Sequence, residues 1–86
     1  MKAVRRDFER GRSAEVDIPA TCRPWRYTNE HTACTCPGCG RPMRVGEGYE
    51  SEEYTTQRGY GYTVCWECRE YENGRIARAR KGELNA

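Results

Sequence analysis

The stretches Cys36-Pro37-Gly38-Cys39-Gly40 and Cys65-Trp66-Glu67-Cys68 decide the fold of this chain. Each contains a Cys-x-x-Cys pair, and 25 residues separate the two pairs. Two residues between cysteines allow a tight turn or a first helical turn to present both sulfurs to one metal ion. A tetrahedral zinc site then needs a second pair from elsewhere in the chain. The spacing therefore predicts one structural Zn2+ ion bound by four thiolates.

The apolar composition makes such a metal ion almost necessary. The chain has 86 residues, enough for one small domain of marginal stability. Its branched aliphatic residues number only seven: Val4, Val16, Ile18, Val45, Val64, Ile76 and Leu84. A structural zinc ion contributes an apparent ~10 to 16 kcal/mol to folding, which can replace a missing core. We therefore predict that the metal-free chain is largely unfolded.

The chain shows no apolar stretch that would act as a targeting or membrane segment. We therefore expect a cytoplasmic protein with no membrane partner. In the cytosol thiols stay reduced, so paired Cys-x-x-Cys units indicate metal binding rather than disulfides. If the protein were exported, its six cysteines could instead form a disulfide framework.

The N-terminal third has weaker patterns. Val4 and Phe8 lie four residues apart, as do Arg5 and Glu9, which favours a short basic helix or a mobile arm over residues 1–12. Residues 13–20 alternate, which indicates a brief strand ending near Pro19. Next come two aromatic residues, Trp25 and Tyr27, which either pack over the zinc site or form a stacking platform for bases.

From Cys36 onward the pattern becomes regular. Pro37, Gly38 and Gly40 are typical of a tight knuckle around two sulfurs. Residues 49–55 and 60–64 are rich in Tyr, Thr and Val and predict an antiparallel hairpin. After Cys65 the composition changes to helix formers, and Asn73-Gly74 would either end this helix or break it.

Knuckle, hairpin and a helix carrying the second ligand pair follow one another as in a treble clef zinc finger. The run Cys36-x-x-Cys39-Gly40-Arg41-Pro42-Met43-Arg44-x-Gly46-Glu47-x-Tyr49, closed by Cys65-x-x-Cys68, resembles small treble clef proteins of phages and actinobacteria. The resemblance covers residues 36–71 and implies a small α+β fold with zinc ligands at Cys36, Cys39, Cys65 and Cys68. It divides the chain into an irregular N-terminal extension (1–33), the zinc domain (34–73) and a basic C-terminal helix or tail (74–86). A flat zinc ribbon without a helix is the architectural alternative.

Three further residues have ligand chemistry: Cys22, His31 and Cys34. They could hold a second zinc ion only with a carboxylate or water as the fourth ligand. We expect instead a packed cysteine, a spare thiol and a surface imidazole. In a displaced register, Cys34 could substitute for Cys36.

The sequence argues against an enzyme and against a small-molecule substrate. His-Asn-His nucleases resemble the chain only in the knuckles, and residues 40–64 contain no histidine. A thioredoxin-type role for Cys36 and Cys39 would need a βαβ scaffold that this chain is too short to build. We therefore expect a binding module without catalytic residues.

The two ends of the chain are basic. Residues 1–12 contain five Lys or Arg and two acids, and residues 69–81 contain five and two again. Four thiolates and one Zn2+ add a charge of −2, which brings the metal-bound protein from its formal +2 close to neutral. Only these ends could then contact phosphates.

Two function hypotheses follow. In the first, the module binds DNA or RNA, with phosphate contacts from Arg5, Arg6, Arg75, Arg78, Arg80 and Lys81. In the second, it is a zinc-stapled adaptor, such as a phage protein that docks on host transcription or replication machinery. Its contact surface would then be the acidic, tyrosine-rich hairpin with Glu52, Glu53, Tyr54, Tyr60 and Tyr62. The basic ends favour the first.

Overall fold

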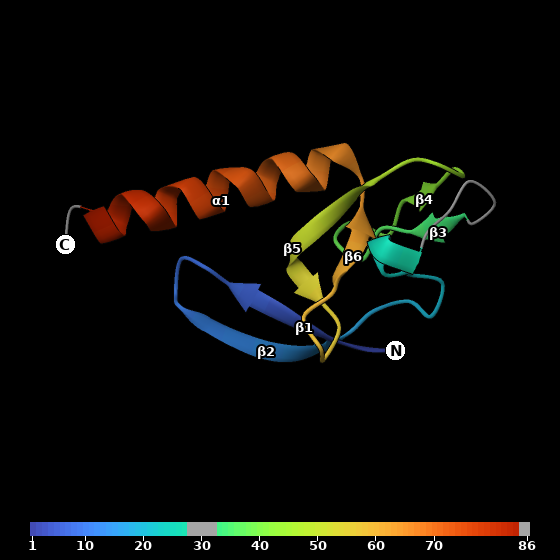
Figure 1. Ribbon diagram of the computed structural model, residues 1–86, viewed down its shortest axis with the longest axis horizontal. Coiled ribbons are helices and arrows are strands. Elements are labelled where there is room, and N and C mark those ends of the chain that lie inside the picture. The colour runs from blue at the N-terminus through green and yellow to red at the C-terminus, as the bar shows by residue number, and fades with distance from the viewer. Residues whose placement is uncertain (28–32, 85–86) are drawn as a thin grey trace.

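The computed structural model describes residues 1–27 and 33–84 and shows a small α+β protein (Figure 1). Its elements are the strands β1 (Lys2–Asp7), β2 (Arg12–Asp17), β3 (Cys34–Thr35), β4 (Pro42–Met43), β5 (Tyr49–Thr55) and β6 (Gly61–Val64), the 3-10 helix η1 (Trp25–Tyr27) and the helix α1 (Trp66–Leu84). One sheet has the strand order β2-β1-β5-β6, and β3 pairs with β4 in a second, two-stranded sheet. The helix rules out the flat-ribbon alternative.

Residues 1–12 do not form the helix or mobile arm that the sequence predicts. β1 pairs along its whole length with β2, from Lys2 opposite Asp17 to Asp7 opposite Arg12, and also contacts β5. Gly11, with φ 67°, lies in the turn between the strands rather than at a helix end. A helix of twelve residues is marginal without a partner, whereas β1 gains hydrogen bonds on both sides. The strand predicted within residues 13–20 is confirmed as β2, although it ends at Asp17. Residues 2–17 therefore form a hairpin rather than an irregular extension.

The predicted hairpin is confirmed in β5 and β6, which pair with a register irregularity between Glu50 and Thr55. Gly61 allows β6 to lie close to β5, since a Cβ at this position would lie 2.2 Å from the backbone oxygen of Ser51. The other edge of β6 is covered by the segment before η1, where the Thr63 amide donates to the Arg23 carbonyl. The hairpin thus joins the N-terminal strands to the helix and delivers Cys65 at its end.

Helix α1 does not end or break at Asn73-Gly74, as the sequence suggests. It continues for 19 residues to Leu84, although a glycine inside a helix costs about 1 kcal/mol relative to alanine. Contacts beyond Gly74 hold it: Ile76 is buried, and Arg75 binds a buried carboxylate of β5. The segments 34–73 and 74–84, which the sequence assigns to separate units, therefore share one helix.

The apolar interior consists of two small clusters. One contains Cys34, Cys36, Met43, Val64 and Cys65. The other contains Ala3, Ile18, Cys22 and Tyr62. Tyr54 packs against both clusters and joins them. Such small clusters give little hydrophobic stabilisation, so the metal site and polar contacts must supply the rest.

The molecule is elongated, with extents of 45 × 22 × 19 Å. In Figure 1 α1 runs along one side, its first half over β5 and its second half beside the β1–β2 hairpin. Within residues 1–27 and 33–84, no helix combines the length and the apolar composition needed to cross a bilayer.

Candidate metal centre

The structure brings together the four cysteines that the sequence predicts as ligands. The Sγ atoms of Cys36, Cys39, Cys65 and Cys68 all lie within 4.8 Å of one another. Cys36 and Cys39 lie in the turn between β3 and β4, Cys65 follows β6, and Cys68 lies in the first turn of α1. Two segments distant in sequence, the β3–β4 turn and the junction of β6 with α1, thus converge on one point.

Backbone hydrogen bonds shape the knuckle. The Cys36 amide donates to the Arg41 carbonyl at 2.9 Å, and the Gly40 amide donates back to the Cys36 carbonyl at 2.8 Å. The Cys65 amide lies 3.4 Å from the Cys36 sulfur, in position to donate to a thiolate. The knuckle and the start of the helix are therefore joined even by contacts that do not involve a metal.

The spacing of the sulfurs fits a tetrahedral metal ion. With Zn–S bonds of about 2.3 Å, the edges of a ZnS4 tetrahedron measure about 3.8 Å. The Cys39 and Cys65 sulfurs are 3.8 Å apart. Four sulfur donors within 4.8 Å of one another could hold a metal ion, and the set is complete without a water or a carboxylate.

The thiols of this cluster differ in acidity. Burial, followed by hydrogen bonds with Cys36 and Cys65, raises the pKa of Cys68, and burial also raises the pKa of Cys39. Burial alone would also raise the pKa of Cys65, but hydrogen bonds from Cys68 and Cys39 outweigh it and lower that pKa. A metal ion must displace protons from these thiols, so its affinity falls as the pH falls.

Addition of Zn2+ to metal-free protein near neutral pH is therefore expected to release about four protons, because cysteine thiols of an unfolded chain are protonated there. A pH-indicator titration in weak buffer measures the release. Release of two protons or fewer would mean that only one Cys-x-x-Cys pair binds the ion.

Gly38 lies against the metal centre and leaves no room for a side chain. A Cβ built at Gly38 would be 2.9 Å from the Cys68 sulfur and 3.7 Å from the Cys36 sulfur. A metal-bound sulfur cannot rotate away, so we expect Gly38→Ala to weaken zinc affinity about 10- to 100-fold in a competition titration with a chromophoric chelator.

Gly82→Ala provides the matched control for this glycine substitution, because nothing lies within 4 Å of a Cβ at this helical position. The control should bind zinc as tightly as the wild type and should gain about 1 kcal/mol of helix stability. Equal zinc affinities for the two variants would show that the Cys36 and Cys68 sulfurs leave room for a side chain at Gly38.

The remaining cysteines do not join the centre. Cys34 packs beside it in the first apolar cluster, so the displaced register in which Cys34 replaces Cys36 is wrong. Cys22 is buried in the second cluster, where burial raises its pKa to about 11. Both behave as packed apolar side chains, as expected for Cys22. His31 lies outside the described residues.

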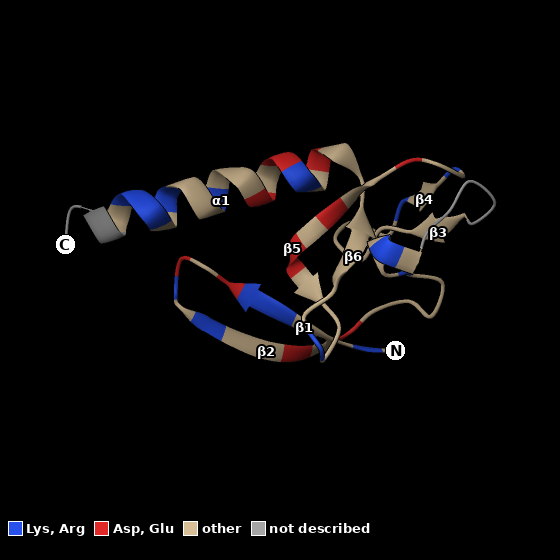
Figure 2. Cartoon of the chain, viewed as in Figure 1, with Lys and Arg blue, Asp and Glu red and all other residues tan. Residues whose placement is uncertain are grey.

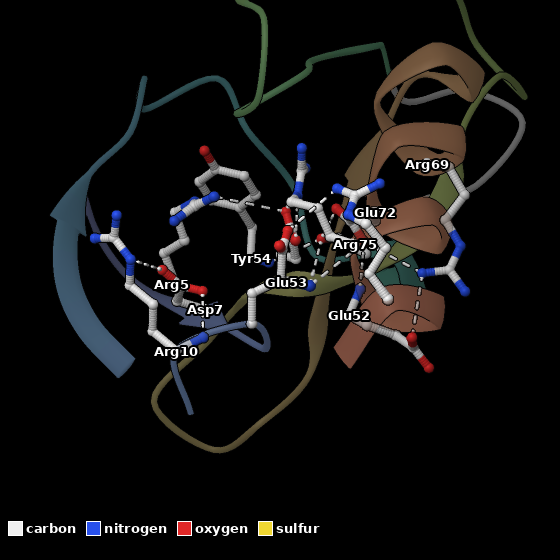
Figure 3. A network of polar contacts seen from close by, with 12 residues as sticks. Arg5, Asp7, Arg10, Glu52, Glu53, Tyr54, Arg69, Glu72 and Arg75 are labelled. Atoms are coloured by element: carbon white, nitrogen blue, oxygen red, sulfur yellow. Dashed lines mark hydrogen bonds and ion pairs between the residues drawn. The ribbon is translucent and has the colours of Figure 1, made fainter. Parts of the chain in front are cut away.

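The six basic residues predicted to contact phosphate fall into two groups. Arg75 is committed to the interior: its Nε and Nη2 donate to the two carboxylate oxygens of Glu53 at 2.6 and 2.7 Å (Figure 3). Arg5 lies 3.9 Å from the same carboxylate and over the Tyr54 ring. Neither guanidinium is free for phosphate, so Arg75 and Arg5 are corrected to structural residues.

Three of the other four residues, Arg6, Arg78 and Arg80, line a groove between the β1–β2 hairpin and the second half of α1. One part of the groove, of about 240 Å³, is lined by Arg6, Phe8, Glu52, Ile76, Ala79 and Arg80. The adjoining part, of about 460 Å³, is lined by Phe8, Glu9, Arg10, Gly11, Arg78, Ala79 and Gly82. We call Arg6, Arg10, Arg78 and Arg80 the arginine groove. Lys81 is exposed but does not line it.

The groove unites the two basic ends, which Figure 2 shows as blue segments on the hairpin and on the end of α1. Arg78 donates to Glu9 at 3.2 Å across it, and both side chains are exposed. Arg6 and Arg80 make no ion pair with another described residue. Arg10 was missed from the sequence because an isolated residue near a turn carries no signal of what lies opposite.

Only part of the acidic, tyrosine-rich surface that the sequence predicts as a contact with a partner protein is exposed. Glu53 is 1% exposed and Tyr62 is 4% exposed, so neither can contact a partner protein. Tyr60 packs edge-on against Tyr27, with the Arg26 guanidinium 4.3 Å from the Tyr60 ring centre. Trp25 remains half exposed rather than covering the metal centre. Glu52 is exposed, and Tyr54 and Tyr60 are half-buried.

Comparisons of the chain with protein-family models, with curated proteins and with solved structures find no match. Function therefore has to be inferred from the geometry of the chain itself.

Proposed function

We propose that the protein is a small, non-enzymatic zinc module that binds DNA or RNA through the arginine groove. The observation that carries the proposal is the convergence of Arg6 and Arg10 with Arg78 and Arg80 around one groove. Guanidinium groups bind phosphate oxygens in a bidentate manner, and several on one surface give sequence-independent affinity. The four thiolates would hold Zn2+, the usual ion of such sites, and the order of knuckle, hairpin and helix supports a treble clef.

The division of the basic residues supports this role. Arg75 pairs with the buried Glu53, and Arg69 pairs with the half-exposed Glu52, so both arginines connect α1 with β5. Arg6 and Arg80 are left without carboxylate partners among the described residues, and Arg78 has only an exposed, weak pair with Glu9. The structural ion pairs thus hold the helix so that its last turns present the remaining arginines beside the hairpin.

Binding to nucleic acid is expected to depend strongly on salt. Four phosphate contacts from the arginine groove correspond to a slope of log K against log salt of about −3.6 for duplex DNA. Affinity should therefore fall about 150-fold from about 50 mM to about 200 mM salt. Fluorescence anisotropy with a short mixed-sequence duplex, and with one of its strands, measures this. Absence of salt-sensitive binding to both probes would overturn the proposal.

Substitutions in the groove test the same proposal by residue. Arg80→Gln and Arg6→Gln should each weaken binding and reduce the salt slope by about 1, because each removes one phosphate contact. Arg44→Gln is the matched control, since Arg44 is 92% exposed and lies outside the groove. If Arg44→Gln weakens binding as much as Arg80→Gln does, the groove is not the site.

The adaptor hypothesis loses part of the surface on which it depended. Burial of Glu53 and Tyr62 removes two of its five residues, and Tyr60 packs against Tyr27 and Arg26.

We propose that the protein is located in the cytoplasm, where thiolate ligands stay reduced.

A further inference from the structure

A second surface of the protein, beside the metal centre, carries exposed aromatic side chains. Tyr49 is 53% exposed and Trp66 is 58% exposed, although the chain has few apolar residues for its core. Both line a cavity of about 500 Å³ and an adjoining one of about 330 Å³. We call this the aromatic cavity. Half-exposed aromatic rings beside a concavity are typical of a binding site rather than of packing.

The fold holds this cavity in shape. Trp66 is the first residue of α1, directly after the ligand Cys65, which itself lines the larger part. Arg69, Glu70 and Asn73 follow on the same helix face, at the spacing of three, four and seven residues, and line the smaller part. A metal ion that fixes Cys65 and Cys68 therefore also fixes one wall of the cavity. Little conformational entropy would then be lost when a ligand binds there.

The charges around the cavity favour a cation. Its two arginines already have carboxylate partners in the chain: Arg41 lies 3.3 Å from the half-exposed Glu67, and Arg69 lies 3.2 Å from the buried Glu72. Its two carboxylates are available: Glu70 makes no ion pair with a described residue, and Glu47 is paired only with the exposed Arg44 at 4.0 Å. Four thiolates with a divalent ion add −2 beside the larger part. This environment repels phosphate and attracts positive charge.

We propose that the aromatic cavity binds an arginine side chain from a basic segment of a partner protein. A guanidinium lies flat on a tryptophan face more readily than an ammonium does, and its N–H groups can reach a carboxylate at the same time. Trp66 and Glu70, one helical turn apart, offer these two contacts, and Tyr49 lines the same cavity. The protein would thus bind a polyanion at one end and a cationic peptide at the other.

The test uses full-length, zinc-loaded protein with the conservative substitution Trp25→Phe, so that Trp66 is the only tryptophan. The probe is the peptide acetyl-Gly-Arg-Gly-Arg-Gly-amide, and the control is the same peptide with citrulline, which is neutral but has the same shape. We expect a saturable change in Trp66 fluorescence with the arginine peptide and binding about tenfold weaker with the citrulline peptide.

Variants locate the contact. Glu70→Gln and Tyr49→Leu should each weaken binding of the arginine peptide about fivefold, because they remove the carboxylate and one ring. Tyr71→Leu is the matched control: this tyrosine is on the same helix, 65% exposed, and outside the cavity. Circular dichroism and zinc content confirm that each variant is folded.

Four results would overturn the proposal. The first is equal binding of the two peptides, and the second is loss of peptide binding in Tyr71→Leu. The third is quenching of Trp66 fluorescence by oligothymidine that is abolished in Tyr49→Leu. The fourth is a change in Trp66 fluorescence caused by protein concentration alone. The third would indicate base stacking and the fourth self-association. Arginine-groove variants should leave peptide binding unchanged, so failure of this proposal is distinguishable from failure of the nucleic-acid proposal.

Discussion

Removal of the metal ion is expected to unfold the entire chain. The two apolar clusters are small, and the four sulfurs join the knuckle, the end of β6 and the start of α1. Zinc binding in such sites supplies an apparent ~10 to 16 kcal/mol, which is comparable to the whole stability of an ordinary domain. Titration with a strong chelator, followed by far-UV circular dichroism, should show loss of both helix and sheet signals, with recovery when Zn2+ is added back.

Single cysteine substitutions separate ligands from packed thiols. Cys39→Ser removes an exposed sulfur from the centre and should prevent zinc binding and folding, although an exposed side chain normally tolerates substitution. Cys22→Ala removes a more buried sulfur outside the centre and should keep one zinc ion, with a loss of about 1 kcal/mol. Native mass spectrometry counts the ions. A folded, zinc-bound Cys39→Ser protein, or unchanged melting after chelation, would contradict the central role of the metal.

Loss of the Arg75 guanidinium is expected to be the most damaging change outside the metal centre. Glu53 is 1% exposed, and Arg75 binds both of its carboxylate oxygens. Arg75→Met would leave this carboxylate buried with only the more distant Arg5 as a partner, at 3.9 Å. Breaking a buried pair from one side costs about 3 kcal/mol or more, so urea unfolding of the zinc-loaded variant should begin at much lower concentration.

Arg78→Met is the matched control for this ion pair, because it makes the same change one turn further along α1. Arg78 is 63% exposed and its partner Glu9 is 42% exposed, so the pair is solvated and its loss should cost no more than about 1 kcal/mol. The double variant Glu53→Leu with Arg75→Met should recover part of the lost stability, since it no longer buries a charge. Equal losses for Arg75→Met and Arg78→Met would show that the pair with Glu53 does not hold the helix.

The attachment of α1 explains why this pair is decisive. Ile76 is buried on the helix, and the other buried side chain that anchors it is Glu72. Glu72 accepts hydrogen bonds from the Ser51 hydroxyl at 2.6 Å and from the Glu52 amide at 2.9 Å, and Arg69 binds the same carboxylate (Figure 3). No buried side-chain nitrogen or oxygen in the described part of the chain lacks a hydrogen-bond partner. The helix is therefore fixed mainly by satisfied polar groups, which act only when every partner is present.

The four-cysteine cluster, the β5–β6 hairpin and the start of α1 could be predicted from the sequence, because they depend on short spacings and local composition. The two Cys-x-x-Cys units alone point to Cys36, Cys39, Cys65 and Cys68. The strand β1 could not be predicted in this way, since a strand is stabilised by partners distant in sequence, here β2 and β5.

Tertiary structure also decided which charges are free. In the sequence Arg75 and Arg80 look alike, and so do Glu52 and Glu53. Packing of α1 on β5 buries Glu53 against Arg75 and leaves Arg80 beside Arg6 in the groove. Whether a charge is structural or available for a ligand depends on what lies opposite it after folding, and no local pattern contains that information.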